Sequence, residues 1–158
     1  MHRVGFGYDA HRFASGRRLV LGGVEVPSEL GLHGFSDADV VTHAVIDALL
    51  GAGGLGDIGT HFPSSDPQYE GISSIELLRR TAKMLERDGW TPVNVDVTAV
   101  LERPRLAHYA DRMRSTLGRA LKIERDRVSV KAKTSDGMGF TGRGEGIAAY
   151  AVALLERP

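Results

Sequence analysis

Two histidines and an aspartate in the first third of the chain are residue types that bind transition metals. Asp9 and His11 are two positions apart at the end of an alternating segment, residues 3–9, that is typical of a β-strand, so both side chains point the same way if the strand continues. His43 falls on a predicted helix. A carboxylate and two neutral imidazoles are good zinc ligands, and three protein ligands leave a fourth position open for catalysis. The alternatives are a turn capped by Asp9, a solvated His11 and a His43 with an ordinary hydrogen bond.

The helix that carries His43 has a predicted start and a polar row. Ser36 is a favourable N-cap residue and Asp39 follows three positions later, which is close to a capping box, so we expect the helix to begin near Asp37. Asp39, His43 and Asp47 are spaced four apart and form a polar row beside the buried face. The helix N-terminus is either a site for an anion or a plain capped end.

A glycine-rich segment, GAGGLGDIG, follows this helix. One of its glycines is expected to supply a left-handed C-cap, and the others exceed what a cap needs. Asp57 between Gly56 and Gly59 therefore suggests a tight loop that approaches a ligand, with a flexible linker as the alternative. Residues 62–66 (FPSSD) form either a flap over a site or a surface loop.

Lys133 lies at the end of a predicted strand, directly before Thr134, Ser135 and Asp136. Cationic, hydroxyl and carboxylate groups at one strand end suit a phosphate together with a divalent ion. The simpler alternative is an exposed strand-terminal lysine.

The other predicted elements alternate between strands and helices. In the first strand Val4, Phe6 and Tyr8 share one face, opposite Gly5, Gly7, Asp9 and His11. The remaining predictions are a hairpin at 19–27 turning at Gly22-Gly23, a helix from the Ser73/Glu76 capping box to Gly89, a strand at 93–101, a helix at 106–121, and strands at 128–134 and 147–155. The last strand is apolar almost throughout, as expected of a strand covered on both faces. Hairpins and helical connections together predict an α+β fold with a two-layer mixed sheet.

Composition limits the class of protein. The 158 residues suit one domain spanning 1–158, and the formal net charge of +0 gives no electrostatic case for nucleic acid or a membrane surface as the partner. The absence of cysteine excludes disulfides and thiolate metal sites and fits a reducing compartment. No signal, transit or membrane-spanning segment is recognisable, so a cytoplasmic location is expected.

Five motifs occur in the order and at the separations found in one known family. They are G-x-D-x-H at 7–11, SDADVVTH at 36–43, GLGDIGxxFP at 54–63, KTSD at 133–136 and GFTGRGEG at 139–146. Over essentially its whole length the chain resembles the 2-C-methyl-D-erythritol 2,4-cyclodiphosphate synthases of the non-mevalonate isoprenoid pathway. Several ordered motifs are more specific than any one of them.

The resemblance implies a fold, an assembly and a reaction. Family members have a two-layer mixed sheet with three main helices on one face, and they form homotrimers whose sheets face the axis, with active sites between neighbouring subunits. The reaction is that of a phosphorus–oxygen lyase: 4-diphosphocytidyl-2-C-methyl-D-erythritol 2-phosphate cyclises to 2-C-methyl-D-erythritol 2,4-cyclodiphosphate and releases CMP. Whether the axial cavity binds a prenyl diphosphate is left open.

The resemblance also implies two metal positions. Asp9, His11 and His43 would hold zinc or another divalent ion, and Asp136 would hold magnesium or manganese at the diphosphate. Thr134 would donate its hydroxyl to charge that develops in the transition state, and it is mapped as catalytic together with Phe35.

The substrate-binding positions carried over from the family form four groups. Phe35 and Ser36 would hold the 2-phosphate by their backbone, near Asp9, Ala10 and His11. The erythritol part would contact Asp57, Ile58, Gly59, Phe62, Pro63, Ser64, Ser65 and Asp66. Cytidine would lie along Leu101, Glu102, Arg103, Pro104, Arg105, Leu106, Ala107, Lys133, Thr134, Ser135 and Asp136. Phe140 and Arg143 also map onto ligand contacts and, with Glu145, are expected to line the trimer axis.

Three positions depart from the family pattern. Phe35 stands where a histidine is usual, which removes an imidazole hydrogen bond to the substrate unless His33 supplies it. Asp136 is one methylene shorter than the commoner glutamate, and Ser64 replaces a frequent aspartate. Two rival functions are a zinc hydrolase acting on a phosphorylated substrate and a nucleotide- or isoprenoid-binding module without turnover.

Overall fold

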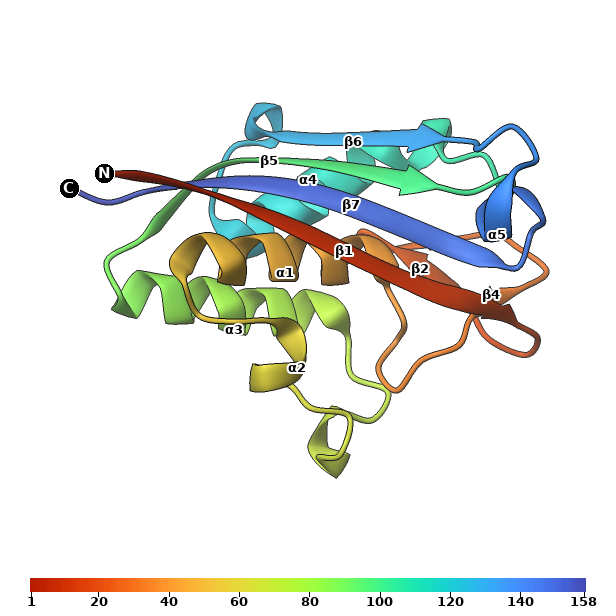
Figure 1. The fold of residues 1–158 in the computed structure, drawn as a ribbon, viewed down its shortest axis with the longest axis horizontal. Helices are drawn as coiled ribbons and strands as arrows, with labels where there is room; N and C mark the ends of the chain where they lie inside the picture. Colours follow the sequence, from red (N-terminus) through yellow and green to blue (C-terminus); the bar gives the residue numbers. More distant parts are fainter.

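The central sheet of the computed structural model, which describes residues 1–158, is built around two long antiparallel strands, β1 (His2–Ala14) and β7 (Gly146–Glu156) (Figure 1). β5 (Thr91–Val100) pairs antiparallel with β7, and β6 (Val128–Lys133) pairs parallel with β5. β4 (Gly31–Leu32) adds to the other edge, so the strand order is β4-β1-β7-β5-β6. The predicted mixed sheet is therefore confirmed.

Three main helices lie on one side of this sheet, as expected (Figure 1). α1 (Val40–Gly53) packs on β1 and β7, α4 (Ala110–Leu121) packs on β6, and α3 (Ser74–Arg87) packs on α1 and α4. Short elements complete the chain: α2 (Ile58–His61), α5 (Gly139–Gly142) and the 3-10 turns Pro67–Tyr69, Ala107–Tyr109 and Arg125–Arg127. None of the helices has the length and apolar character needed to cross a membrane.

The predicted hairpin is also present. β2 (Leu19–Leu21) and β3 (Val24–Val26) pair antiparallel across the Gly22-Gly23 turn and form a separate two-stranded sheet. Both glycines have positive φ, with values of 57° and 74°, which is a conformation that glycine adopts without steric cost.

Several predicted boundaries are corrected by the structure. α1 begins at Val40 and not near Asp37, because Ala38 has a φ of 58° that interrupts helical geometry before that point. The helix expected at 106–121 is a 3-10 turn followed by α4, and β5 starts at Thr91 with a register shift beside Val93. Ser73 occupies the N-cap of α3, but its side chain makes no capping hydrogen bond.

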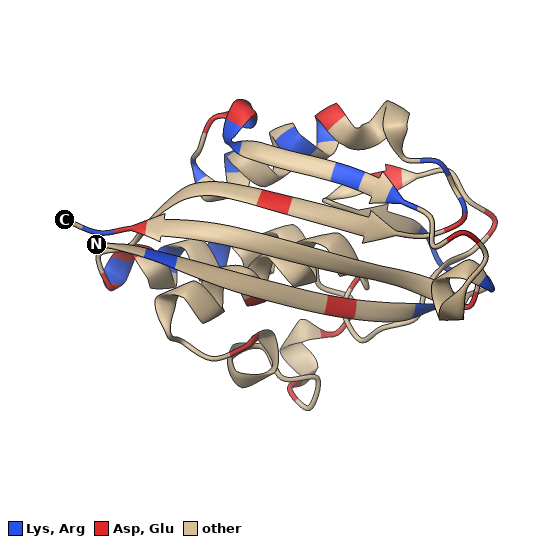
Figure 2. Ribbon diagram, turned by 45° about the horizontal axis from the view of Figure 1, so that its top comes forward, with Lys and Arg blue, Asp and Glu red and all other residues tan.

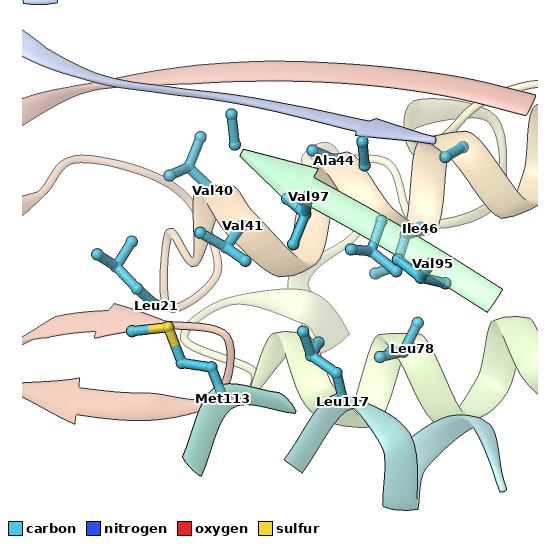
Figure 3. Close-up of a cluster of buried hydrophobic side chains, with 14 of the residues drawn as sticks. Leu21, Val40, Val41, Ala44, Ile46, Leu78, Val95, Val97, Met113 and Leu117 are labelled. Atoms are coloured by element: carbon cyan, nitrogen blue, oxygen red, sulfur yellow. The ribbon is translucent and has the colours of Figure 1, made fainter. Parts of the chain in front are cut away.

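The hydrophobic core lies between the sheet and the helices. Figure 3 shows Val95 and Val97 of β5 facing Ile46 of α1, with Leu78 of α3 and Leu117 of α4 closing the other side. All five side chains are buried. The core draws on α1, α3, α4, β5 and β7, whereas β1 contributes only the partly buried Phe13 and its two buried glycines, so α1 is fixed by the core and β1 is fixed by its contacts with α1 and β7.

The outer face of β1 and β7 is apolar and uncovered in the single chain. Phe6 is 63% exposed and Tyr150 43%, and these two rings lie 6.4 Å apart between centroids. Figure 2 shows long stretches of β1 and β7 without charge, whereas most charged residues lie on helices, loops and strand ends. The expectation that β7 is covered on both faces is therefore wrong for one chain, and exposed positions at Tyr150 and Val152 alternate with buried ones.

Candidate active site

Asp9, His11 and His43 converge, as the sequence predicted. Asp9 Oδ2 lies 2.9 Å from His11 Nε2 and 2.9 Å from His43 Nδ1, and the two ring nitrogens are 3.2 Å apart. An ion with tetrahedral bonds of zinc length needs its ligand atoms about 3.3 Å apart, so the spacing present is close to the one required. These three residues form the one group of three or more His, Cys, Asp or Glu side chains in the chain that could hold an ion.

Small residues bring the strand and the helix close enough for this convergence. A Cβ added at Gly7 of β1 would lie 1.9 Å from the Ala44 carbonyl oxygen of α1, and one at Gly5 would lie 1.9 Å from that of Ala48. Gly5, Gly7 and Asp9 share one face of β1. The close contact between the two glycines and α1 therefore also brings Asp9 close to His43, which lies on the same helix.

The tautomer of His11 is set by the backbone. Its Nδ1 lies 2.7 Å from the carbonyl oxygen of His33, and a carbonyl only accepts, so Nδ1 carries the proton and donates it. In the neutral imidazole this leaves the Nε2 lone pair facing Asp9 and His43, whereas in the protonated ring Nε2 donates to Asp9. This arrangement suits a metal ligand, because a histidine that binds a metal through one ring nitrogen usually donates a hydrogen bond from the other nitrogen to a carbonyl or carboxylate oxygen.

Charge and hydrogen bonding lower the pKa of Asp9 and raise the pKa of His11. Burial raises the pKa of Asp9, but hydrogen bonds from His11 and His43 outweigh burial and hold that pKa well below its usual range. Burial lowers the pKa of His11, but the hydrogen bond to Asp9, the charge of Asp9 and the hydrogen bond to His33 together outweigh burial, so the pKa lies above its ordinary value. A carboxylate that stays ionised is what a cation site needs.

Asp39 has a different role from the one predicted. It is fully buried and is itself the N-cap of α1, where Oδ1 accepts from the backbone N–H of Thr42 at 3.0 Å. The same carboxylate accepts from the backbone N–H groups of Gly22 at 2.9 Å and Gly23 at 2.7 Å. Asp39 therefore connects the β2–β3 hairpin to the start of α1. The polar row of Asp39, His43 and Asp47 was predicted beside the buried face of the helix, but Asp39 and His43 are themselves buried.

Ser36 does not cap α1, but it reaches the candidate site. Its Oγ lies 3.1 Å from His43 Nε2 and accepts from the backbone N–H of Ala38 at 3.2 Å. Arg17 holds this loop by donating to the carbonyl oxygens of Gly34 at 2.8 Å and Ser36 at 2.9 Å. Sequence reasoning missed Arg17, because nothing in its surroundings signals a contact with residues 34–36.

Asp37 and Ser74 were also missed. Ser74 Oγ lies 2.8 Å from His43 Nε2, and it donates a short hydrogen bond to Asp37 Oδ1. Asp37 Oδ2 accepts from the backbone N–H of Ser74 at 3.0 Å, so this carboxylate supplies the cap that Ser73 does not. The neighbouring Ser73 matched a capping motif, and that pattern concealed the contact of Ser74.

The glycine-rich segment behaves in part as predicted. Gly54 is the left-handed C-cap of α1, and Asp57 caps the short helix α2 by accepting from the backbone N–H of Thr60 at 2.9 Å. Asp57 and Gly59 are exposed, whereas Asp47 Oδ1 accepts from the backbone N–H of Ile58 at 2.9 Å. The loop is therefore tied to α1 while the Asp57 carboxylate faces solvent, and residues 62–66 extend beyond it with Asp66 capping the next turn.

The predicted cytidine segment gathers at the ends of β5 and β6. Glu102 Oε1 accepts from the backbone N–H groups of Ser135 and Gly137, each at 3.3 Å, and so orders the 134–137 loop. Lys133, Thr134 and Asp136 are exposed. None of them joins the group of Asp9, His11 and His43.

The register of the sheet gives the distance between these two parts of the predicted site. Lys133 aligns with Val100, Val100 with Ala148, and Ala148 with Ala10. Three strand spacings separate Ala10 from Lys133, which is about 14 Å in one chain. A cavity of about 540 Å³ at the end of β1 is lined by His11, Phe140 and Glu145 among others, and Arg143 pairs with Glu145 at 2.9 Å.

Comparison with known proteins shows which family the chain belongs to. A model of the YgbB family matches residues 2–156. A 2-C-methyl-D-erythritol 2,4-cyclodiphosphate synthase from Symbiobacterium thermophilum is 59% identical over 152 residues, which cover 96% of this chain and 97% of the relative. The chain belongs to the 2-C-methyl-D-erythritol 2,4-cyclodiphosphate synthase family. It is therefore a cyclase that forms the cyclic diphosphate in isoprenoid precursor biosynthesis.

Solved structures of the cyclodiphosphate synthase family share this fold. One, described as the bound form with CDP, superposes with a TM-score of 0.89 at 37% identity and covers 98% of this chain and 100% of its own. The bifunctional IspDF of Campylobacter jejuni gives a TM-score of 0.96 at 35% identity, covering 100% of this chain and 43% of its own. The α+β prediction is thus confirmed by both topology and likeness to this synthase family.

Proposed function

We propose that the cyclisation takes place between the Asp9–His11–His43 group and the 133–136 loop, with the residues that the sequence indicated. An oxygen of the substrate's 2-phosphate attacks the β-phosphorus, a new P–O bond forms, and the bond from that phosphorus to the oxygen bridging the α- and β-phosphates breaks. CMP leaves with the bridging oxygen and its electron pair. The attacking group is already an anion, so no side-chain nucleophile is needed.

The convergence of Asp9, His11 and His43 is the observation that carries this proposal. The group fits a zinc ion in spacing and in donor type, since two imidazole nitrogens and a carboxylate oxygen face one point. Divalent ions bound at the diphosphate supply positive charge that offsets the repulsion between two anionic phosphates. Asp136 would hold the second ion, magnesium or manganese, through oxygen.

The other residues position the substrate and exclude water. The Phe35–Ser36 backbone, anchored by Arg17 and by the hydrogen bond from the N–H of Gly71 to the Phe35 carbonyl at 2.8 Å, would hold the 2-phosphate. The Asp57–Gly59 and Phe62–Asp66 segments would cover the erythritol part. Residues 101–107 and 133–136 would bind cytidine, with the Thr134 hydroxyl donating to the developing charge.

A homotrimer would complete this site. Within one chain Ala10, which lies between Asp9 and His11, is about 14 Å from Lys133 at the start of the 133–136 loop, and a neighbouring copy would offer a second 133–136 loop to the same group. The exposed apolar face of β1 and β7 provides the surface on which two further copies could pack. A prenyl diphosphate at the trimer axis and a cytoplasmic location stay predictions.

Replacing one proposed ligand tests the function. We expect His43→Ala to abolish CMP release and to lower bound zinc from about one ion per chain to near zero, while the chain stays folded. Metal analysis of the purified protein, with chromatographic detection of CMP and the cyclic product, measures both. A variant that keeps full turnover would overturn the metal site, and a linear phosphate product would indicate a hydrolase.

A further inference from the structure

The inner nitrogen of His43 contacts a buried serine that is itself bound to a carboxylate. His43 Nε2 lies 2.8 Å from Ser74 Oγ, and Ser74 Oγ donates to Asp37 Oδ1. Ser74 has no solvent-exposed surface, and His43 is 8% exposed. The three groups form a continuous chain from the N-terminus of α3 to the metal ligands.

Only one proton arrangement satisfies this chain. A serine hydroxyl has a single proton, and an ionised carboxylate can only accept, so the Ser74 proton points to Asp37. Towards His43 the same oxygen can then only accept. In this arrangement His43 carries its proton on Nε2, which leaves the Nδ1 lone pair directed at Asp9 and His11.

Ser36 offers a competing arrangement. Its Oγ also lies within hydrogen-bond distance of His43 Nε2, at 3.1 Å, and could donate to that nitrogen. His43 would then carry its proton on Nδ1, 2.9 Å from Asp9, and would be unable to bind an ion there. The negative charge of Asp37, transmitted through Ser74 at the shorter distance, favours a proton on Nε2.

We propose that Asp37 and Ser74 are positioning residues that hold His43 in its Nε2–H tautomer and thereby set the metal affinity of the Asp9–His11–His43 group. The inference rests on the proposed metal site and adds the two residues that keep the Nδ1 lone pair of His43 free to bind the ion. Partners of this kind, behind a metal-binding histidine, typically account for 10–100-fold in metal affinity. Ser74 is also the first residue of α3, so the same hydroxyl couples that helix to the site.

Two adjacent serines supply a matched comparison. Ser74→Ala removes the hydroxyl that contacts His43, whereas Ser73→Ala removes an exposed hydroxyl with no side-chain capping bond. We expect zinc affinity, measured by competition with a chromophoric chelator, to fall about 10–100-fold in Ser74→Ala and to stay at the wild-type value in Ser73→Ala. Asp37→Asn keeps a side-chain acceptor without the charge and should lose several-fold.

A spectroscopic readout separates positioning from a general structural role. In zinc-loaded, 15N-labelled protein, the proton on His43 Nε2 should give a downfield imidazole signal that exchanges slowly, because Ser74 accepts from it. In Ser74→Ala this signal should move upfield or be lost by exchange, and in Ser73→Ala it should stay. A proton resonance on Nε2 that is unchanged in Ser74→Ala, together with wild-type zinc affinity, would overturn the proposal.

The outcomes also distinguish this proposal from the proposed function. If the wild-type chain binds no zinc, the metal site fails and the positioning role fails with it. If the wild type binds zinc and Ser74→Ala binds it equally, only the positioning role is wrong. Asp37→Asn gives a second test should Ser74→Ala not fold, because it leaves the Ser74 hydroxyl in place.

Discussion

At the scale of single residues, Asp9 and His11 make the candidate site sensitive to pH. Burial raises the pKa of Asp9 and lowers that of His11, but hydrogen bonds and opposite charges together outweigh burial in both cases. A raised histidine pKa means that the folded state binds the proton more tightly than the unfolded chain does. The stability that His11 contributes is therefore present below its ordinary pKa near 6.5 and is lost as pH rises through the raised folded-state value.

We expect opposite pH dependences with and without metal. In the presence of EDTA, the thermal unfolding midpoint should fall as pH rises from the ordinary histidine pKa of 6.5 through the raised pKa of folded His11, since His11 loses its proton and its charged hydrogen bond to Asp9. Zinc affinity should instead rise over this range, because a protonated imidazole cannot bind an ion. Calorimetry of the two forms measures both effects, and His11→Gln should flatten the metal-free dependence. A wild type with the same pH profile as His11→Gln would contradict the argument.

At the scale of elements, the site depends on how closely α1 approaches β1. Gly5 and Gly7 on the strand face Ala44 and Ala48 on the helix, and any side chain on the glycines would overlap helix backbone. The absence of side chains lets the two backbones come into contact, so that Asp9 reaches His43 at 2.9 Å. The spacing of the metal ligands is thus a property of the β1–α1 contact.

Gly7→Ala tests this contact, and Gly51→Ala is its control. A Cβ at Gly7 would meet the Ala44 carbonyl oxygen at 1.9 Å, so α1 must move, and we expect a loss of about 1–3 kcal/mol or more in unfolding free energy together with weaker zinc binding. At exposed Gly51 on the same helix the nearest atom is 3.9 Å away, and alanine should stabilise by about 0.5–1 kcal/mol. Urea unfolding and chelator competition on both variants give the comparison. Equal effects at the two positions would contradict the close-approach argument.

At the scale of the whole molecule, one chain leaves an apolar sheet face uncovered and separates the parts of its proposed site. Val4, Phe6, Tyr8, Tyr150 and Val152 are all exposed on the face of β1 and β7 that points away from the helices. Aromatic contacts join three of them, with Tyr8 and Tyr150 5.1 Å apart between ring centroids. A contiguous apolar face of this kind is typical of an interface between copies.

We expect a solution mass near three times the 17.0 kDa of the chain, measured by size-exclusion chromatography with light scattering. Val152→Asp should shift the mass towards the monomer, because a buried unpaired charge at an interface is strongly unfavourable. Lys83→Asp, an exposed position on α3, should leave the assembly intact. A wild-type monomer with full CMP release would show that the second and third copies are not needed for the site.

Features that depend on local spacing could be predicted from the amino-acid sequence alone. Alternation placed Gly5, Gly7 and Asp9 on one face of β1, Gly22-Gly23 identified the hairpin, and the order of the motifs identified the family and the group that could hold a metal ion. Each of these follows from residue types a few positions apart. Backbone geometry converts such spacing directly into a shared face or a turn.

The partners of several buried polar side chains became visible only in the folded chain, because those partners come from distant segments. Asp39 and not Ser36 caps α1 because the Gly22 and Gly23 amides approach Asp39 from another part of the chain. Ser74 reaches His43 because α3 packs on α1. The exposure of Tyr150 follows from the helices covering one side of the sheet only. Hydrogen bonds and burial between segments far apart depend on packing, and no local pattern records them.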